Sequence, residues 1–532
     1  MTTSPEAPVR APHRHRDDVP PTADGPHPGW YRPAPRRRPS PSDRLTAVTR
    51  GAVLLLTGLL TFMIIRLPWI GDMGVHAATV ERLRHDLLHP GNPMVDSPTE
   101  SPYHSPWMVV LALFAKATDL GTFDVLRCAA VVGLVLLFTG VRHFTRTLSA
   151  HPAAPSLAIL CLLFLWGTET YVWSGFLGLV PLSLNIAYPS TFTLGLGLHF
   201  LALLTAALRR GTASGWWTYT GLGLLWALLL LCHQFSGIIL TFGALGVLVA
   251  ARPWPARAVW LRLGAGLAAG TVLLALWPYY SFFSLFGADG LEQIHMTLYH
   301  RKLVRFTFVP LGVLALAVRF RRDRRDPLVV WFLLGLATVV AGAVLDKWSL
   351  GRAEPAVVMP AQIAAALAAV EGGRRLFRAA YATLLSGALV LGAWAQNDAL
   401  GFVLRDEALP RAVTAEGWTV RPTYEWTTRY ARYGEVFMTD WKTAQKLPGY
   451  GFYTVVAGYP DFFLPDEERR LADTERYFAA GTPRDERIAI LRRYHVTWIL
   501  TGRGDHGLSG RDPALRKVAT GPSGQLLYRF VG

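Results

Sequence analysis

The chain has 532 residues, of which 51% are hydrophobic and only 17% are charged, and it contains 18 tryptophans. Its mean hydropathy is +0.27. This composition excludes a disordered protein and does not fit an ordinary soluble enzyme, so we expect a membrane protein. The net charge of +16 is spread along the chain. A nucleic-acid-binding protein would concentrate its basic residues in one domain, so we expect no nucleic-acid partner.

Residues 1–46 contain eleven of the 36 prolines and no apolar periodicity. Such a segment cannot bury enough apolar surface to offset the entropy of ordering, so it is predicted to be a disordered tail. The first apolar run, 47–66, begins too late and is too long for a cleaved secretory signal. We expect it to remain as a membrane anchor.

Ten further apolar runs follow the first one. They cover residues 124–143, 155–173, 190–208, 217–231, 235–250, 259–283, 303–318, 327–345, 355–371 and 377–396. Together the eleven runs predict an α-helical polytopic membrane domain over residues 47–398.

The segment 107–118 decides the topology. It is only a dozen residues long and contains Lys116, so we expect it to lie at the membrane surface rather than to span. The positive-inside rule then places the tail and the arginine-rich loops in the cytoplasm. The first outer loop, 67–123, and the C-terminal segment, 399–532, lie outside. The sequence thus predicts a multi-pass plasma-membrane protein with a cytoplasmic N-terminus and an extracytoplasmic C-terminal domain.

The C-terminal segment 399–532 has mixed charge and short apolar runs that alternate with helical patterns. This alternation predicts a small α/β domain. Its aromatic side chains are suited to stacking on sugar rings, although packing in the core is the alternative for each of them. The eight residues concerned are Trp418, Tyr424, Trp426, Tyr430, Tyr433, Trp441, Tyr450 and Tyr453.

The first outer loop opens with an acidic residue, Asp72, directly before a predicted amphipathic helix on which Ala77, Val80 and Leu83 form an apolar stripe. We expect this helix to lie along the membrane surface. Aspartate is a favoured helix cap, so Asp72 has a purely structural interpretation. On position alone capping is the favoured interpretation, and the alternative is a carboxylate that does chemistry at membrane-surface depth, close to the positive end of a helix.

The order of these elements resembles the GT-C superfamily of membrane glycosyltransferases. The shared features are a cytoplasmic tail, one span, a long outer loop opening with an acidic residue and an amphipathic helix, about eleven spans, and an exported C-terminal domain. The resemblance implies transfer of a sugar from a polyprenyl-phosphate carrier, with Asp72 as the catalytic base. The family often carries an acidic pair at this place, whereas here Met73 follows Asp72.

Such a transfer needs cations that stabilise the departing phosphate. Basic residues near outer helix ends are exceptions to the positive-inside rule and are therefore candidates, although ion pairing or interfacial anchoring would also explain them. We assign substrate and phosphate binding to Arg301, Lys302, Arg305, Lys347, Arg352 and His76.

The sequence neither predicts nor excludes a divalent metal ion as cofactor, and no other cofactor is expected. Asp72 and His76 are one helical turn apart, and Glu81, His85 and His89 are spaced at four. These spacings match no established set of metal ligands.

The sequence therefore predicts an inverting glycosyltransferase, a hexosyl or pentosyl transferase of a bacterial cell envelope. Its partners would be a polyprenyl-phosphate-sugar donor, membrane lipids, and a glycan, lipid or protein acceptor on the outer face of the membrane. Two alternatives remain. One is a transporter or flippase of a lipid-linked substrate, and the other is a non-catalytic scaffold with a degenerate site, which the missing acidic pair would explain.

Overall fold

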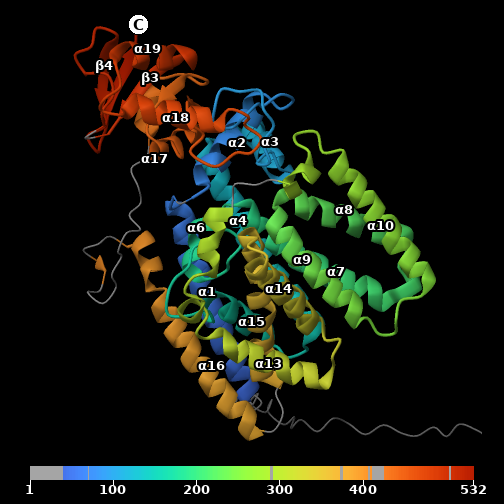
Figure 1. Cartoon of the computed structure of the whole chain (residues 1–532). Coiled ribbons are helices and arrows are strands. Elements are labelled where there is room, and N and C mark those ends of the chain that lie inside the picture. Colours follow the sequence, from blue (N-terminus) through green and yellow to red (C-terminus); the bar gives the residue numbers. More distant parts are fainter. Residues whose placement is uncertain are drawn as a thin grey trace, which may run out of the picture.

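The computed structural model describes residues 40–69, 71–287, 292–371, 375–404, 408–409, 424–502 and 505–532. Most of the predicted tail, 1–46, lies outside these ranges. The described residues form a bundle of helices with a smaller α/β part at one end (Figure 1).

Seven helices in the described part of the chain are long and apolar enough to cross a membrane. This confirms a multi-pass membrane protein. The seven are α1 (Pro41–Arg66), α4 (Thr122–Leu148), α7 (Pro189–Arg210), α10 (Arg257–Ala275), α14 (Pro327–Val344), α15 (Glu354–Glu371, extended by the turn before it) and α16 (Arg375–Ala395). The first of them starts at Pro41, earlier than predicted, because Ser40 caps it through a reciprocal hydrogen-bonded box with Asp43.

The other four predicted spans form shorter helices. They are α5 (Ala154–Phe164), α8 (Trp216–Cys232), α9 (Gln234–Ala250) and α13 (Val309–Arg322). Helix α5 has 11 residues, which is about 17 Å and well short of a hydrocarbon core of about 30 Å. The run predicted over 155–173 stops there because the chain then turns to contact another segment, with Thr168 N donating to Val304 O at 2.9 Å. A count of eleven spans therefore stays a prediction.

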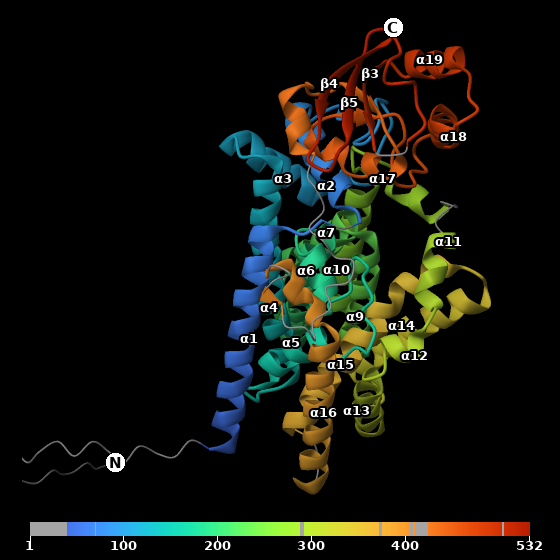
Figure 2. The ribbon, with the colours of Figure 1, turned by 90° about the vertical axis from the view of Figure 1, so that its left-hand side faces the viewer.

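The arginine-rich turns of the bundle lie together at one end. Arg209 at the end of α7 donates to Thr147 O at the end of α4, at 2.7 Å. Arg252, between α9 and α10, pairs with Asp323, between α13 and α14, at 3.5 Å. Figure 2 shows this end below, with the start of α1, and the C-terminal sheet above. The basic turns and the C-terminal part are thus on opposite ends of the bundle.

The first outer loop forms two helices, α2 (Met73–His85) and α3 (Pro106–Thr118). The predicted helix over the apolar stripe is confirmed, and its place along the membrane surface stays a prediction. Ten of the 13 residues of α2 are buried, because the C-terminal part covers this helix. Only glycine fits at position 74, where a Cβ would lie 1.7 Å from Gln445 O.

The C-terminal residues form a five-stranded mixed sheet in the order β2-β1-β3-β5-β4. The strands are β1 (Val436–Met438), β2 (Tyr453–Thr454), β3 (Val496–Thr501), β4 (Leu515–Thr520) and β5 (Leu526–Phe530). Strands β1, β2 and β3 are parallel, and β5 pairs antiparallel with β3 and β4. Alternation along β1 places Phe437 in one core and Val436 and Met438 in the other. The predicted α/β character is confirmed.

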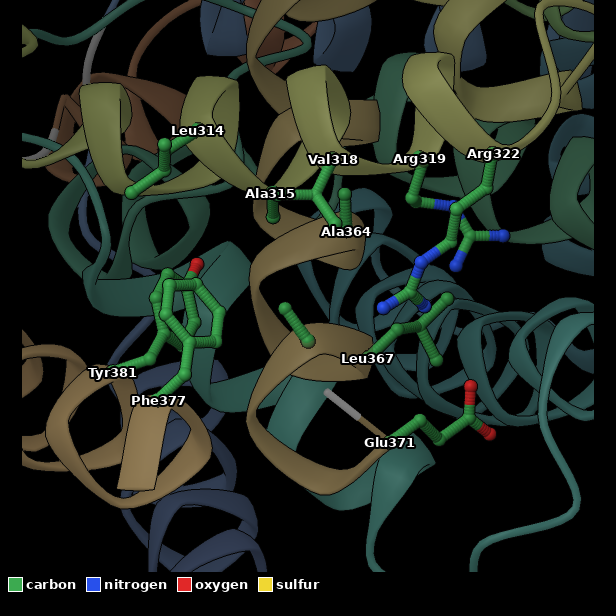
Figure 3. Close-up of a pocket in the computed structure, with 11 residues that line it drawn as sticks. Leu314, Ala315, Val318, Arg319, Arg322, Ala364, Leu367, Glu371, Phe377 and Tyr381 are labelled. Carbon is green, nitrogen blue, oxygen red and sulfur yellow. The ribbon is translucent and has the colours of Figure 1, made fainter. Parts of the chain in front are cut away.

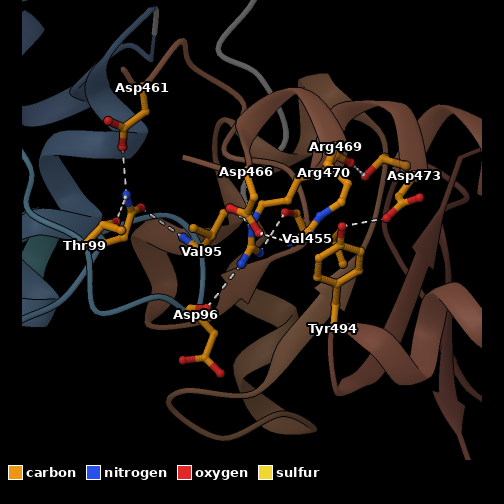
Figure 4. Close-up of polar contacts among 12 residues, drawn as sticks. Val95, Asp96, Thr99, Val455, Asp461, Asp466, Arg469, Arg470, Asp473 and Tyr494 are labelled. Atoms are coloured by element: carbon orange, nitrogen blue, oxygen red, sulfur yellow. Dashed lines mark hydrogen bonds and ion pairs between the residues drawn. The ribbon is translucent and has the colours of Figure 1, made fainter. Parts of the chain in front are cut away.

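Buried polar contacts hold this sheet against the first outer loop. The Arg82 guanidinium is fully buried; it donates to the carbonyls of Gly451 and Phe452 and lies 3.6 Å over the Tyr453 ring. Further contacts join Asn92 to Asp461 and Asp96 to Arg470 (Figure 4). An unpaired buried guanidinium would be costly, so these partners fix how the C-terminal part sits on the loop.

Candidate active site

A cavity of about 420 Å³ lies where the first outer loop, the bundle and the C-terminal part meet. Both the bundle and the C-terminal part contribute polar and apolar side chains to its walls. The residues that line it include Asp72, His76 and Tyr103 of the first outer loop; Trp173, Tyr188, His233, Phe235 and Arg352 of the bundle; and Trp441, Tyr459 and Asp461 of the C-terminal part.

Asp72 occupies the N-cap position of α2, yet its side chain makes no capping hydrogen bond. No residue that the structure describes donates a hydrogen bond to this half-buried carboxylate. The capping interpretation therefore does not describe the structure. Burial raises the pKa of Asp72, and the positive charge of Arg352 opposes that rise. A carboxyl group with a raised pKa is a stronger base once it is ionised.

Arg352 brings a buried positive charge to the same cavity. It belongs to the turn η4 (Trp348–Ala353), and its side chain is 6% exposed. The guanidinium lies 5.0 Å from the ring centre of Trp173 and 4.5 Å from that of Phe235. Its Nε and Nη1 atoms have no hydrogen-bond partner among the described residues. Because buried guanidinium groups are normally paired, this one is suited to receive an anion.

His76 is the third predicted residue in the cavity wall. Its ring meets those of Tyr103 and Tyr188 edge-on, at 5.6 Å and 4.6 Å. Burial lowers the pKa of His76 to about 3, so the imidazole is neutral near pH 7. It can take part in a hydrogen bond but cannot supply positive charge to a phosphate.

Two residues of the C-terminal part complete the polar wall and were missed by the sequence analysis. The Tyr459 hydroxyl lies 2.6 Å from Gly71 O and 3.0 Å from Gln445 O. Asp461 accepts hydrogen bonds from Asn92 Nδ2 at 2.7 Å and Phe463 N at 3.0 Å, and burial raises its pKa. Nothing in the local sequence separates these residues from their neighbours, because only the docking of the C-terminal part onto the first outer loop brings them here.

The other predicted cations do not line the cavity. Arg301 pairs with Glu169 at 2.7 Å, and Arg305 approaches the same carboxylate at 3.6 Å. Lys302 pairs with Glu354, and Lys347 also lies outside the cavity wall. The structure therefore brings Arg352 and His76 to Asp72, and it places Arg301, Lys302 and Arg305 in ion pairs nearby.

The described residues contain no group of three or more His, Cys, Asp or Glu side chains able to hold a metal ion together. Of the spaced set in the first outer loop, His85 pairs with Glu81 at 3.6 Å and stacks on Tyr433 at 3.6 Å between ring centres. This geometry directs both side chains into structural contacts. We therefore derive no chemical step through a metal.

No protein-family model and no curated protein sequence matches the chain. Solved structures do. The arabinofuranosyltransferase AftD from mycobacteria matches with a TM-score of 0.53 and 16% identity, over 92% of this chain and 40% of AftD. ArnT from Cupriavidus metallidurans matches at 0.48 and 16%, over 91% and 98% of the two chains. The oligosaccharyltransferase of Archaeoglobus fulgidus matches at 0.45 and 12%, over 84% and 69%.

These identities are too low to carry an activity across, and the chain spans about 40% of the length of AftD. What the likeness to AftD establishes is the fold, which extends over nearly the whole chain. The chain is a multi-pass membrane protein whose fold resembles that of the mycobacterial arabinofuranosyltransferase AftD.

Proposed function

We propose that the protein is an inverting glycosyltransferase that moves a sugar from a polyprenyl-phosphate donor to an acceptor hydroxyl on the outer face of a bacterial plasma membrane. One observation carries the proposal: Asp72 and Arg352, opposite in charge and both without hydrogen-bond partners at the atoms described above, line the same cavity. A base and an anion-binding group are what this transfer needs.

In the proposed reaction, the acceptor oxygen attacks the anomeric carbon from the side opposite the phosphate. Its proton passes to the Asp72 carboxylate, and the bond between the anomeric carbon and the phosphate oxygen breaks with its electron pair moving to that oxygen. The Arg352 guanidinium stabilises the resulting phosphate charge. One displacement inverts the anomeric configuration. The neutral His76 can orient a hydroxyl through its unpartnered Nδ1.

The apolar wall of the cavity suits a lipid-linked donor. Val172, Leu231, Phe235 and Ile294 line it on the side of the bundle, and the Ile294 side chain is 45% exposed. A polyprenyl chain entering from the membrane would meet this wall first, with its phosphate directed toward Arg352. The arginine-rich turns at the other end of the bundle favour an outward-facing cavity by the positive-inside rule.

The absent acidic pair has a structural explanation. The Met73 side chain is 1% exposed and packs in the core of the bundle, so a carboxylate at that position would point away from the cavity. Asp461 instead supplies a second carboxylate to the cavity wall. A half-buried Asp72 and a buried Arg352 without hydrogen-bond partners among the described residues reduce stability, so a purely structural role does not account for them.

The test is a transfer assay in membrane vesicles with a panel of labelled polyprenyl-phosphate sugars. We expect a covalent product with the wild-type chain and a rate of transfer lower by at least about 10²-fold with Asp72→Asn. The matched control is Asp119→Asn, because Asp119 belongs to the same loop and is exposed in an ion pair with Arg84. Equal rates for Asp72→Asn and wild type would remove the mechanism. Movement of labelled lipid across sealed vesicles without a covalent product would replace it with a flippase.

A further inference from the structure

A second cavity adjoins the candidate active site on the C-terminal part. Its volume is about 550 Å³, and Trp441 and Pro460 belong to the walls of both cavities. Trp441 begins the short helix α17 (Trp441–Ala444), which Asp440 caps through the backbone N–H groups of Lys442 and Thr443. Because these two residues line both cavities, the second cavity lies next to the one whose wall contains Asp72.

One face of a helix forms most of this second cavity. Helix α18 (Glu467–Phe478) contributes five residues to the wall. The last four lie four, seven, eight and eleven positions after the first, and this spacing puts all five on one side of the helix. These residues are Glu467, Leu471, Thr474, Glu475 and Phe478. Leu471 is 37% exposed and Glu475 is also exposed, so this face carries apolar surface and a carboxylate side by side.

Trp441 is the exposed aromatic residue at the junction. Of the eight aromatic residues that the sequence singled out, Tyr430, Tyr433 and Trp441 are 42%, 41% and 42% exposed. Tyr433 is stacked on His85, Tyr424 is buried, and Trp418 lies outside the described residues. Trp441 is therefore an exposed aromatic residue that lines both cavities, and an exposed ring is what a stacking ligand needs.

We propose that the acceptor is a neutral oligosaccharide and that this acceptor groove, lined by Trp441 and by the α18 face from Glu467 to Phe478, binds its sugar residues behind the one that is glycosylated. The inference rests on the proposed function and names the substrate class. A sugar ring stacks on Trp441, and hydroxyl groups donate to the carboxylates of Glu467 and Glu475. The terminal hydroxyl then reaches Asp72.

The chemistry of the groove favours an oligosaccharide over an extended peptide. A peptide gains affinity by pairing its backbone with a strand edge, and none of the described residues that line the groove belongs to a strand. The backbone groups within a helix such as α18 are already paired with one another. Its carboxylates also disfavour polyanionic glycans, because like charges repel.

The test measures binding to the full chain in nanodiscs by calorimetry. The probes are size-fractionated neutral oligosaccharides of one, two, four and six residues, prepared from a bacterial cell-envelope polysaccharide. We expect wild-type affinity to rise with length. Trp441→Ala should weaken binding of the six-residue probe about tenfold, the upper range for losing one aromatic contact. The control Tyr430→Ala removes an equally exposed ring of the same domain and should change binding less than twofold.

Three results would contradict the proposed acceptor groove. They are a binding affinity that does not depend on oligosaccharide length, equal losses of affinity in Trp441→Ala and Tyr430→Ala, and Trp441-dependent binding of unstructured peptides but not of oligosaccharides. A fourth variant separates this inference from the proposed function. Asp72→Asn should lose transfer but keep the length-dependent binding. Transfer by the wild type without any length dependence would refute the groove alone, whereas length-dependent binding without transfer from any donor would refute the glycosyltransferase alone.

Discussion

Two sets of charged side chains, one at each end of the helical bundle, differ in whether they have partners among the described residues: Asp72 and Arg352 do not, and Arg319 and Asp326 do. Under the C-terminal part, Asp72 and Arg352 are held without hydrogen-bond partners at the edge of a cavity of about 420 Å³. At the other end, a pocket of only about 40 Å³ is lined by Arg319, which faces α15 from α13 (Figure 3). There Arg319 pairs with Asp326 at 2.6 Å.

The difference between these two sets of side chains shows where the chain keeps charged groups available to bind a ligand. Folding normally satisfies buried charges internally, as it does at the arginine-rich end. Unpaired charges persist where a partner from outside completes them, and burial then makes each contact with that partner stronger. The comparison between the two ends can therefore be tested by removing one charge at each end and measuring both transfer and stability.

The largest effect is expected from removing the base. Asp72→Asn should lower the rate of transfer by roughly 10²–10⁴-fold, the usual contribution of a general base. Its thermal midpoint should not fall, because the carboxylate makes no hydrogen bond to the described residues. Transfer assays and thermal unfolding of the purified chain measure the two quantities.

Asp326→Asn is the matched change at the other end and should behave in the opposite way. It removes the ion pair with Arg319 and should cost about 1 kcal/mol of stability, while transfer stays within about twofold of wild type because the residue is remote from the reacting atoms. Comparable losses of transfer in both variants would erase the contrast between the two ends.

The second largest effect is expected at Arg352. Arg352→Gln removes the positive charge that we assign to the leaving phosphate, so transfer should fall by roughly 10²–10³-fold. The loss should include weaker donor binding, visible as a raised KM for the polyprenyl-phosphate sugar. Arg319→Gln removes an arginine that already has a carboxylate partner and should leave KM unchanged. A normal donor KM in Arg352→Gln would mean that another group binds the phosphate.

The pH profile follows from the raised pKa of Asp72. The base works only when ionised, so the rate should fall as the pH drops through this raised pKa, about tenfold for each pH unit below it. The stability effect has the opposite sign. Because the folded pKa lies above the unfolded one, the folded state favours the protonated form, and the stabilisation present at low pH is lost as the pH rises.

Asp72→Asn provides the control for the pH profile. Its side chain does not titrate, so the difference in thermal midpoint between the variant and the wild type should grow with rising pH. A constant difference across the acidic range would show that Asp72 keeps an ordinary pKa in the folded protein.

The sequence predicted the features that depend on local composition. Helices formed at all eleven apolar runs, and Asp72 was singled out by its position directly after the first span together with the family resemblance. Burial of α2 was not predictable, since the surface that covers it comes from residues more than 350 positions later. Asp461 and Tyr459 were missed for the same reason.

The choice among the predicted cations also needed the fold. In sequence, Arg301 and Arg352 look alike, because each is a basic residue near an outer helix end. The difference is the partner of each guanidinium in space. Glu169 reaches Arg301 from 132 positions earlier in the chain, whereas two nitrogens of Arg352 have no partner among the described residues.

The smallest effect is therefore expected at Arg301, even though it lies near the cavity end of the bundle. Its side chain is 67% exposed and pairs with a carboxylate that is itself 30% exposed, and exposed pairs contribute about 0–1 kcal/mol. Arg301→Gln should change transfer less than about twofold and leave donor KM as in wild type. The same vesicle assay measures both. A loss as large as that of Arg352→Gln would move the phosphate site to the 301–305 segment, since it would show that Glu169 gives up its partner when the donor arrives.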